Sequence, residues 1–235
     1  MGAAPDRQGA LEVSGRTSGA QHLPTTNSAE PPPYEGRVFG GIVLAAFLLY
    51  GIGSAMADQP IGLALVGINS IAVALAGIIG FRLVRASSRS VGLGYLAARI
   101  AEGVLLLGGI LMAELADLGG ADTTGYLLAM SILSVGSIPF LMAARRVQLL
   151  PQALATWGIY GYASLAIGAL LELLTGRSLA VVFAVPGGLF ELVLGLRLIW
   201  QGFESPIEVS DQRFARTKRS VLDRPDTRQS SQSPG

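Results

Sequence analysis

Six long apolar stretches, separated by short polar breaks, dominate the middle of the chain. They cover residues 38–57, 61–84, 91–115, 125–144, 153–174 and 179–201. Each stretch has roughly the 20 apolar residues that a helix needs to cross the hydrocarbon core of a bilayer. Proline and glycine lie in or beside several of the breaks, as is typical of helix ends. The pattern predicts an all-α fold: a polytopic membrane protein built as a bundle of six transmembrane helices.

Polar segments flank this apolar region on both sides. Residues 1–37 are rich in Pro, Ser, Thr, Gln and Gly, and residues 205–235 are polar with a small basic cluster. Segments of this composition bury too little apolar surface to fold, so we expect two disordered tails around one domain, 38–204. The PPPY sequence at 31–34 matches a proline-rich pattern that small adaptor domains bind, or it forms only a stiff lead-in to the first helix.

The distribution of arginine predicts how the helices are oriented. Three arginines lie at 82–90 and two at 145–151, whereas the alternate breaks carry acidic residues and one arginine, Arg177. Because basic residues stay on the cytoplasmic side of a membrane, we expect both termini in the cytoplasm. The preference for arginine over lysine, with abundant Ala, Gly and Leu, suggests a bacterial protein. The expected location is therefore the bacterial cytoplasmic (inner) membrane.

The composition excludes several kinds of chemistry. The chain has no cysteine, and its single histidine, His22, lies in the polar N-terminal segment. Disulfides, thiolate nucleophiles and cysteine-based zinc sites are therefore excluded, and no imidazole lies in the membrane region. We expect no metal and no cofactor. The net charge of +1 gives no indication of a nucleic-acid partner, so the lipid bilayer is the expected surrounding.

Three charged residues interrupt the apolar stretches well away from their ends: Arg99, Glu102 and Glu191. At about 1.5 Å per residue, the two carboxylates lie at similar depths, roughly 15 Å from the cytoplasmic ends of their helices. An isolated charge at that depth costs roughly 2.5–3.5 kcal/mol, so the charges are expected to pair. Arg99 shares a helix face with Glu102 and lies at the right depth to reach Glu191.

Uncharged polar residues extend this predicted buried cluster. Asn69 in the second stretch is expected to form an interhelical hydrogen bond of about 1 kcal/mol. Three tyrosines either reach the same polar core or pack elsewhere: Tyr50, Tyr160 and Tyr162.

Small residues lie at four-residue spacing beside the two carboxylates, and two prolines interrupt helices. Gly94 and Ala98 precede Glu102 on its face, and Gly187 and Gly195 lie on either side of Glu191. Small residues at this spacing let helix backbones approach closely, so we expect the third and sixth helices to touch there. Helix kinks are expected at Pro139 and Pro186, where proline removes a backbone donor.

Three parts of the chain resemble a known family. The segments GYLAARIAEGVLLLGG (94–109), LLPQALATWGIYGYASLAIGALLELLTG (149–176) and PGGLFELVLGLRLIWQGF (186–203) resemble the bacterial six-span family catalogued as domain of unknown function 4386. Asn69 also resembles a position of that family. The resemblance covers roughly 38–204 and implies a six-helix bundle, and it brings no assigned activity with it.

This pattern favours the first of three functions, with the second as its main alternative. In the first, the protein is a structural or partner-binding membrane component, joining another membrane protein or a second copy, whose Arg/Glu cluster fixes helix packing. In the second, it is a small permease or proton-linked transporter that uses Glu102 or Glu191. The third, an intramembrane enzyme, is least favoured, because carboxylates would be its only acid–base groups and no catalytic residue can be named.

Overall fold

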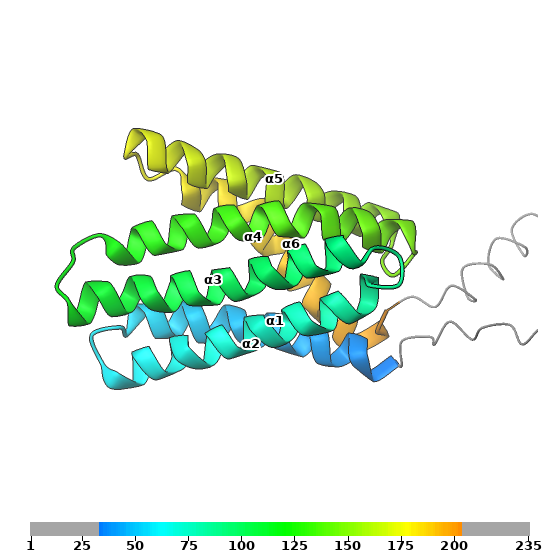
Figure 1. Cartoon of the computed structure of the whole chain (residues 1–235), viewed down its shortest axis with the longest axis horizontal. Coiled ribbons are helices and arrows are strands. Elements are labelled where there is room, and N and C mark those ends of the chain that lie inside the picture. Colours follow the sequence, from blue (N-terminus) through cyan, green and yellow to red (C-terminus); the bar gives the residue numbers. More distant parts are fainter. Residues whose placement is uncertain (1–32, 204–235) are drawn as a thin grey trace, which may run out of the picture. The chain divides into compact units, whose positions relative to one another are not determined.

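The computed structural model describes residues 33–203, and within this range the chain forms six helices and no strands. The helices are α1 (Pro33–Ala55), α2 (Pro60–Val84), α3 (Arg89–Leu115), α4 (Ala121–Arg146), α5 (Gln152–Thr175) and α6 (Ala180–Gln201). All six are long and apolar enough to cross a membrane (Figure 1). The predicted all-α bundle of six membrane-spanning helices is confirmed, and the protein is an integral, multi-pass membrane protein.

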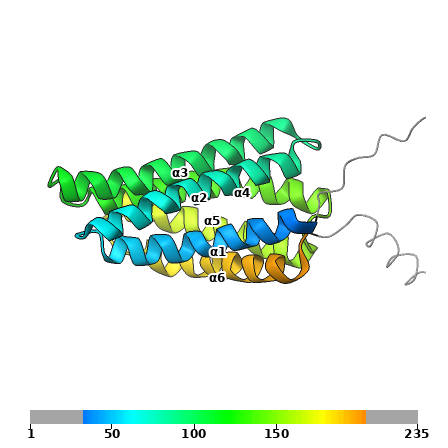
Figure 2. The ribbon, with the colours of Figure 1, turned by 90° about the horizontal axis from the view of Figure 1, so that it is seen from below.

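The six helices form a closed ring. Each helix packs against its neighbours in the chain, and α6 returns to pack against α1. As a result, α3 and α6 lie on opposite sides of the bundle (Figure 2). The α2–α3 and α4–α5 connections lie at the same end as the start of α1 and the end of α6 (Figure 1). We call this end the arginine end, and the opposite end, with the other three connections, the acidic end.

The first helix begins earlier than predicted. It starts at Pro33, so the expected disordered tail over 1–37 is wrong for its last five residues. Proline suits a first helical turn because its missing N–H has no acceptor there in any case. Glu35 in that turn pairs with Arg82 of α2 at 3.1 Å, so tertiary contacts extend the helix past its apolar stretch. The remainder of both predicted tails and the first two residues of the PPPY sequence lie outside the described residues.

Apolar packing is concentrated at the arginine end. A large cluster of buried side chains there joins all six helices and includes Phe39, Val84, Phe140, Leu154 and Leu198. The acidic end has a much smaller cluster of Leu127, Ala169 and Ala180. The polar side chains that are buried lie inside the ring, whereas many large apolar side chains are exposed on the outside. Such an exterior suits a hydrocarbon environment, and the interior is filled much more completely at one end.

The predicted contact between the third and sixth helices is wrong. Within residues 33–203, α3 and α6 do not pack along their lengths, because ring closure puts them on opposite sides. Ala98 packs instead against Gly136 of α4, where a Cβ added at Gly136 would lie 2.3 Å from the Ala98 Cβ. A Cβ at Gly94 would meet no described atom within 4 Å, but the Gly94 carbonyl oxygen lies 3.4 Å from a Cβ added at Gly136, so Gly94 too faces α4 rather than α6.

The two glycines of the sixth helix do support close packing, but with other partners. Gly187 packs against Gly161 of α5, where a Cβ added at Gly161 would lie 2.9 Å from the Gly187 Cα. Gly195 packs against α1, where an added Cβ would lie 2.7 Å from Leu44. Small residues therefore mark backbone approach between helices, as expected in membranes, although the spacing alone does not reveal which helices meet.

Both prolines lie inside continuous helices. Neither Pro139 in α4 nor Pro186 in α6 ends its helix, and a kink at either position stays a prediction. Next to Pro186, the Ser164 hydroxyl of α5 donates a hydrogen bond of 2.9 Å to the Phe183 carbonyl. A neighbouring helix thus supplies a donor to the carbonyl next to that of Val182, which Pro186 leaves without its helical N–H donor. Hydrogen bonds from neighbouring helices help to make such breaks tolerable in membranes.

Candidate functional site

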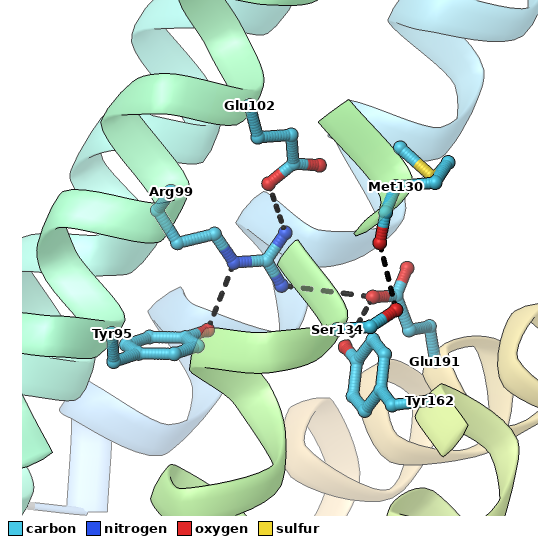
Figure 3. A network of polar contacts seen from close by, with 7 residues as sticks. All are labelled: Tyr95, Arg99, Glu102, Met130, Ser134, Tyr162 and Glu191. Atoms are coloured by element: carbon cyan, nitrogen blue, oxygen red, sulfur yellow. Dashed lines mark hydrogen bonds and ion pairs between the residues drawn. The ribbon is translucent and has the colours of Figure 1, made fainter. Parts of the chain in front are cut away.

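Arg99 is the centre of a buried polar cluster that joins opposite sides of the ring. Its Nη1 contacts Glu102 Oε2 at 2.8 Å on the same helix, and its Nη2 lies 3.6 Å from Glu191 Oε1 on α6 (Figure 3). The side chains of Arg99 and Glu102 are each 6% exposed, and that of Glu191 is 15% exposed. The predicted cluster is therefore present, and the long guanidinium side chain spans the gap between helices that do not pack together.

Two tyrosines complete the cluster. Arg99 Nε donates a hydrogen bond of 3.0 Å to the Tyr95 hydroxyl, and the Tyr162 hydroxyl donates one of 2.5 Å to Glu191 Oε1. Tyr162 is one of the three tyrosines considered in the sequence, whereas Tyr95 was missed. Its position four residues before Arg99, on the same helix face, is the signal that could have identified it.

The cluster carries an excess of negative charge when both carboxylates are ionised, because one guanidinium faces Glu102 and Glu191. Burying charges is tolerated only where they are paired and hydrogen-bonded. Arg99 meets this condition with three polar partners. Each carboxylate uses one oxygen in these contacts, Oε2 of Glu102 and Oε1 of Glu191. The second oxygen of each is left to accept a proton or a hydrogen bond from a ligand.

A cavity of about 250 Å³ lies beside the cluster, inside the ring. Side chains from all six helices line it. Its polar lining consists of Tyr50, Asn69, Arg99, Glu102, Tyr126, Tyr162 and Glu191. The rest is apolar or glycine, including Ala46, Val73, Leu106, Leu165 and Gly188. An apolar cavity with a few convergent polar groups is the usual form of a small-molecule site.

Asn69 lacks the interhelical hydrogen bond that the sequence predicts. Its side chain is 1% exposed and lines the cavity, yet neither its Oδ1 nor its Nδ2 has a hydrogen-bond partner among the described residues. The expectation of a packing bond is therefore wrong. A buried polar atom without a partner costs roughly 1–3 kcal/mol. A donor and an acceptor at a cavity wall are instead suited to a ligand or an enclosed water.

Apolar side chains pack against the cluster toward the arginine end. A void of about 10 Å³ next to Arg99 has Phe39, Phe140, Phe190 and Leu194 in its lining. The Tyr95 ring stacks on Phe140 with centroids 4.1 Å apart, which adds to this packing. The interior of the described bundle is therefore tightly packed on this side of Arg99.

The side chains of this site can bind a ligand and exchange protons. Among residues 33–203, no group of three or more His, Cys, Asp or Glu side chains is placed to hold a metal ion. The carboxylates can accept or release protons, and Asn69 and the tyrosines can donate and accept hydrogen bonds. Comparison with protein-family models, curated proteins and solved structures finds no match for this chain.

Proposed function

We propose that the protein is a small permease whose central cavity binds a small molecule beside Arg99, Glu102 and Glu191. The observation that carries this proposal is the unfilled cavity of about 250 Å³ with the unpartnered Asn69 amide at its wall. Cores built only for stability are packed to near crystal density and leave few voids of this size. Intramembrane carboxylates facing a cavity are typical of substrate and proton pathways.

A scaffold role is the second candidate, and one contact favours it. The Arg99–Glu191 pair ties α3 to α6 across the ring, and buried pairs can specify packing. Such a scaffold would bind another membrane protein or a second copy of this chain. Against it, the shorter Arg99–Glu102 contact joins two residues of α3 and holds no helices together. The permease proposal accounts for both the Arg99–Glu191 pair and the cavity.

Filling the cavity is expected to abolish ligand binding. Ala46 lines the cavity, whereas its neighbour Ala45 is exposed on the outside of α1. Ala46→Leu adds three carbons inside the cavity, and Ala45→Leu adds the same group toward lipid. We expect compounds from a screen of small amines, alcohols, carboxylates and sugars to raise the melting temperature of the purified wild-type protein and of Ala45→Leu, but not of Ala46→Leu. If no compound does so, or if Ala46→Leu responds like wild type, the permease proposal is wrong.

We further propose that the arginine end faces the cytoplasm of a bacterial cell, in the inner membrane. Arg85 lies in the α2–α3 connection, and Arg145 and Arg146 lie in the last turn of α4. Both positions are at the end where α1 begins and α6 ends. The chain has no native cysteine, so single cysteines report topology without background. A membrane-impermeant maleimide should label Gly119→Cys in intact spheroplasts and Ser87→Cys only after lysis. The reverse pattern would place the arginine end outside.

Membership of the six-span family named above is also a proposal. Its support is that the three resembling segments contribute Arg99, Glu102, Tyr162 and Glu191, which meet in one cluster. An experimental structure of a family member should therefore show an arginine between two carboxylates inside a six-helix ring. A member whose corresponding residues face lipid would contradict the assignment.

A further inference from the structure

A second cavity lies next to the central one, toward the acidic end. It measures about 430 Å³, and its lining includes Tyr50 and Tyr126, which also line the central cavity. The two rings stack nearly parallel, at 12°, with centroids 6.1 Å apart. We call the second cavity the vestibule. The stacked tyrosines form a boundary shared by the vestibule and the central cavity.

The vestibule is acidic. Its lining includes Glu114, Asp122 and Glu172, and no basic side chain. Glu172 accepts a hydrogen bond of 2.7 Å from the Ala180 N–H at the start of α6, which fixes one carboxylate at the vestibule wall. Carboxylates in a narrow cleft raise the local concentration of cations and repel anions. The vestibule carboxylates thus have the same sign of charge as Glu102 and Glu191 of the central cavity.

We propose that the ligand of the central cavity is a small organic monocation, a protonated amine with a compact apolar body, admitted from the vestibule past Tyr50 and Tyr126. This inference rests on the permease proposal and names its substrate class. When Glu102 and Glu191 are both ionised, one excess negative charge remains in the cluster of Arg99, Glu102 and Glu191. A single positive charge on the ligand balances it.

The lining favours a cation over an anion. The Arg99 guanidinium already contacts Glu102, Glu191 and the Tyr95 hydroxyl, so it has little capacity left for an anionic ligand. Asn69 Oδ1 is unpartnered and can accept a hydrogen bond from an ammonium group. Tyrosine ring faces attract cations within about 6 Å, and the shared Tyr50–Tyr126 pair lies on the way in. The apolar remainder of the cavity suits a hydrocarbon body.

Three probes of equal length and different charge test the ligand class: butylammonium, butanol and butyrate. Binding to the purified full-length protein at neutral pH is measured by thermal shift and calorimetry. Butylammonium should bind roughly tenfold more tightly than either other probe, because only it gains the attraction of the excess charge. Ala46→Leu should abolish this binding, and Ala45→Leu should not. Equal or tighter binding of butanol or butyrate would overturn the inference.

The same experiment separates the two proposals. If butanol or butyrate binds best and Ala46→Leu abolishes that binding, the cavity is a ligand site and only the cationic class is wrong. If some compounds of the wider screen bind in the cavity but butylammonium does not, the cationic class is again wrong. If neither these probes nor the screen yields a compound sensitive to Ala46→Leu, the permease proposal itself fails.

Thiol labelling provides a test that leaves the charge cluster intact. Ala46→Cys places a single thiol in the cavity of a chain without other cysteines. The labelling rates of a trimethylammonium methanethiosulfonate and of a sulfonate methanethiosulfonate are compared. The ratio of the cationic rate to the anionic rate should be roughly tenfold larger at this thiol than on a free thiol in solution. Tyr126→Ala should speed labelling several-fold, and Tyr160→Ala, whose side chain is 71% exposed on the outside, should not. No charge preference, or no effect of Tyr126→Ala, would contradict admission of a cation past this pair.

Discussion

Replacing Arg99 with glutamine should lower the free energy of unfolding by about 3–5 kcal/mol, the usual cost of leaving a buried charge without its partner. Glu102 and Glu191 would then face each other's charge in the bundle interior with no cation between them. The two carboxylates would have to take up protons or admit water, and either response loosens the packing of α3 against its neighbours. Unfolding in detergent micelles, followed by circular dichroism against denaturant, measures the change.

The control for this prediction is Arg145→Gln. Arg145 is exposed in the last turn of α4, and exposed charges away from special contacts usually change stability by no more than about 0.5 kcal/mol. Adding Glu102→Gln and Glu191→Gln to Arg99→Gln should recover much of the loss, because all three charges are then removed together. If Arg99→Gln is as stable as Arg145→Gln, the guanidinium does not hold the two carboxylates.

Glu191→Gln should have the opposite profile, with little loss of stability and a large loss of binding. Arg99 keeps its 2.8 Å contact with Glu102 and its hydrogen bond to Tyr95, so the remaining pair is neutral and satisfied. We expect a stability loss of about 1 kcal/mol, the usual value of one hydrogen bond. Because the excess negative charge disappears, butylammonium affinity should fall roughly tenfold or more. Thermal unfolding and calorimetry on one preparation measure both quantities.

The contrast between the two variants separates a permease from a scaffold. A matched control is Tyr162→Phe, which removes the hydrogen bond to Glu191 Oε1 without changing the charge. It should lower affinity less than Glu191→Gln does. If Glu191→Gln destabilises the bundle as much as Arg99→Gln and leaves butylammonium binding unchanged, Glu191 is an architectural residue and the scaffold role is favoured.

The positions of the helices could be predicted from the sequence because hydrocarbon imposes a length. A span needs roughly 20 apolar residues, and five of the six helices begin within four residues of the predicted positions. The exception is α1, whose first turn contains Glu35. That turn is polar, and its helical conformation is supported by the contact with Arg82 of α2. Sequence periodicity contains no information on such a contact between distant residues.

Part of the site could also be predicted. The rise per residue places Glu102 and Glu191 at similar depths, with Arg99 within side-chain reach of both. The high cost of an unpaired charge then predicts that the three residues pair. The lateral order of the helices was not predictable from small residues, because Gly and Ala occur on many faces of a nearly uniform apolar helix. Gly94 and Ala98 were therefore expected to contact α6. Ala98 instead packs on α4, and α6 lies on the opposite side of the ring.

The polar atoms without partners were the least predictable feature. Asn69 was expected to bond to another helix, since a polar side chain in hydrocarbon usually finds a partner. It instead lines a cavity, and a cavity is a property of the whole ring that no single segment encodes. The same holds for the vestibule, because its acidic residues come from α3, α4 and α5.

A double-mutant cycle on Arg99 and Glu191 tests most directly whether the two sides of the ring meet through this ion pair. The free energies of unfolding of wild type, Arg99→Gln, Glu191→Gln and the double variant are compared in the same detergent. Residues in one ion-pair network show coupling energies of roughly 0.5–3 kcal/mol. We predict a value of at least about 1 kcal/mol, with the double variant more stable than Arg99→Gln alone. Strictly additive losses would contradict the pairing.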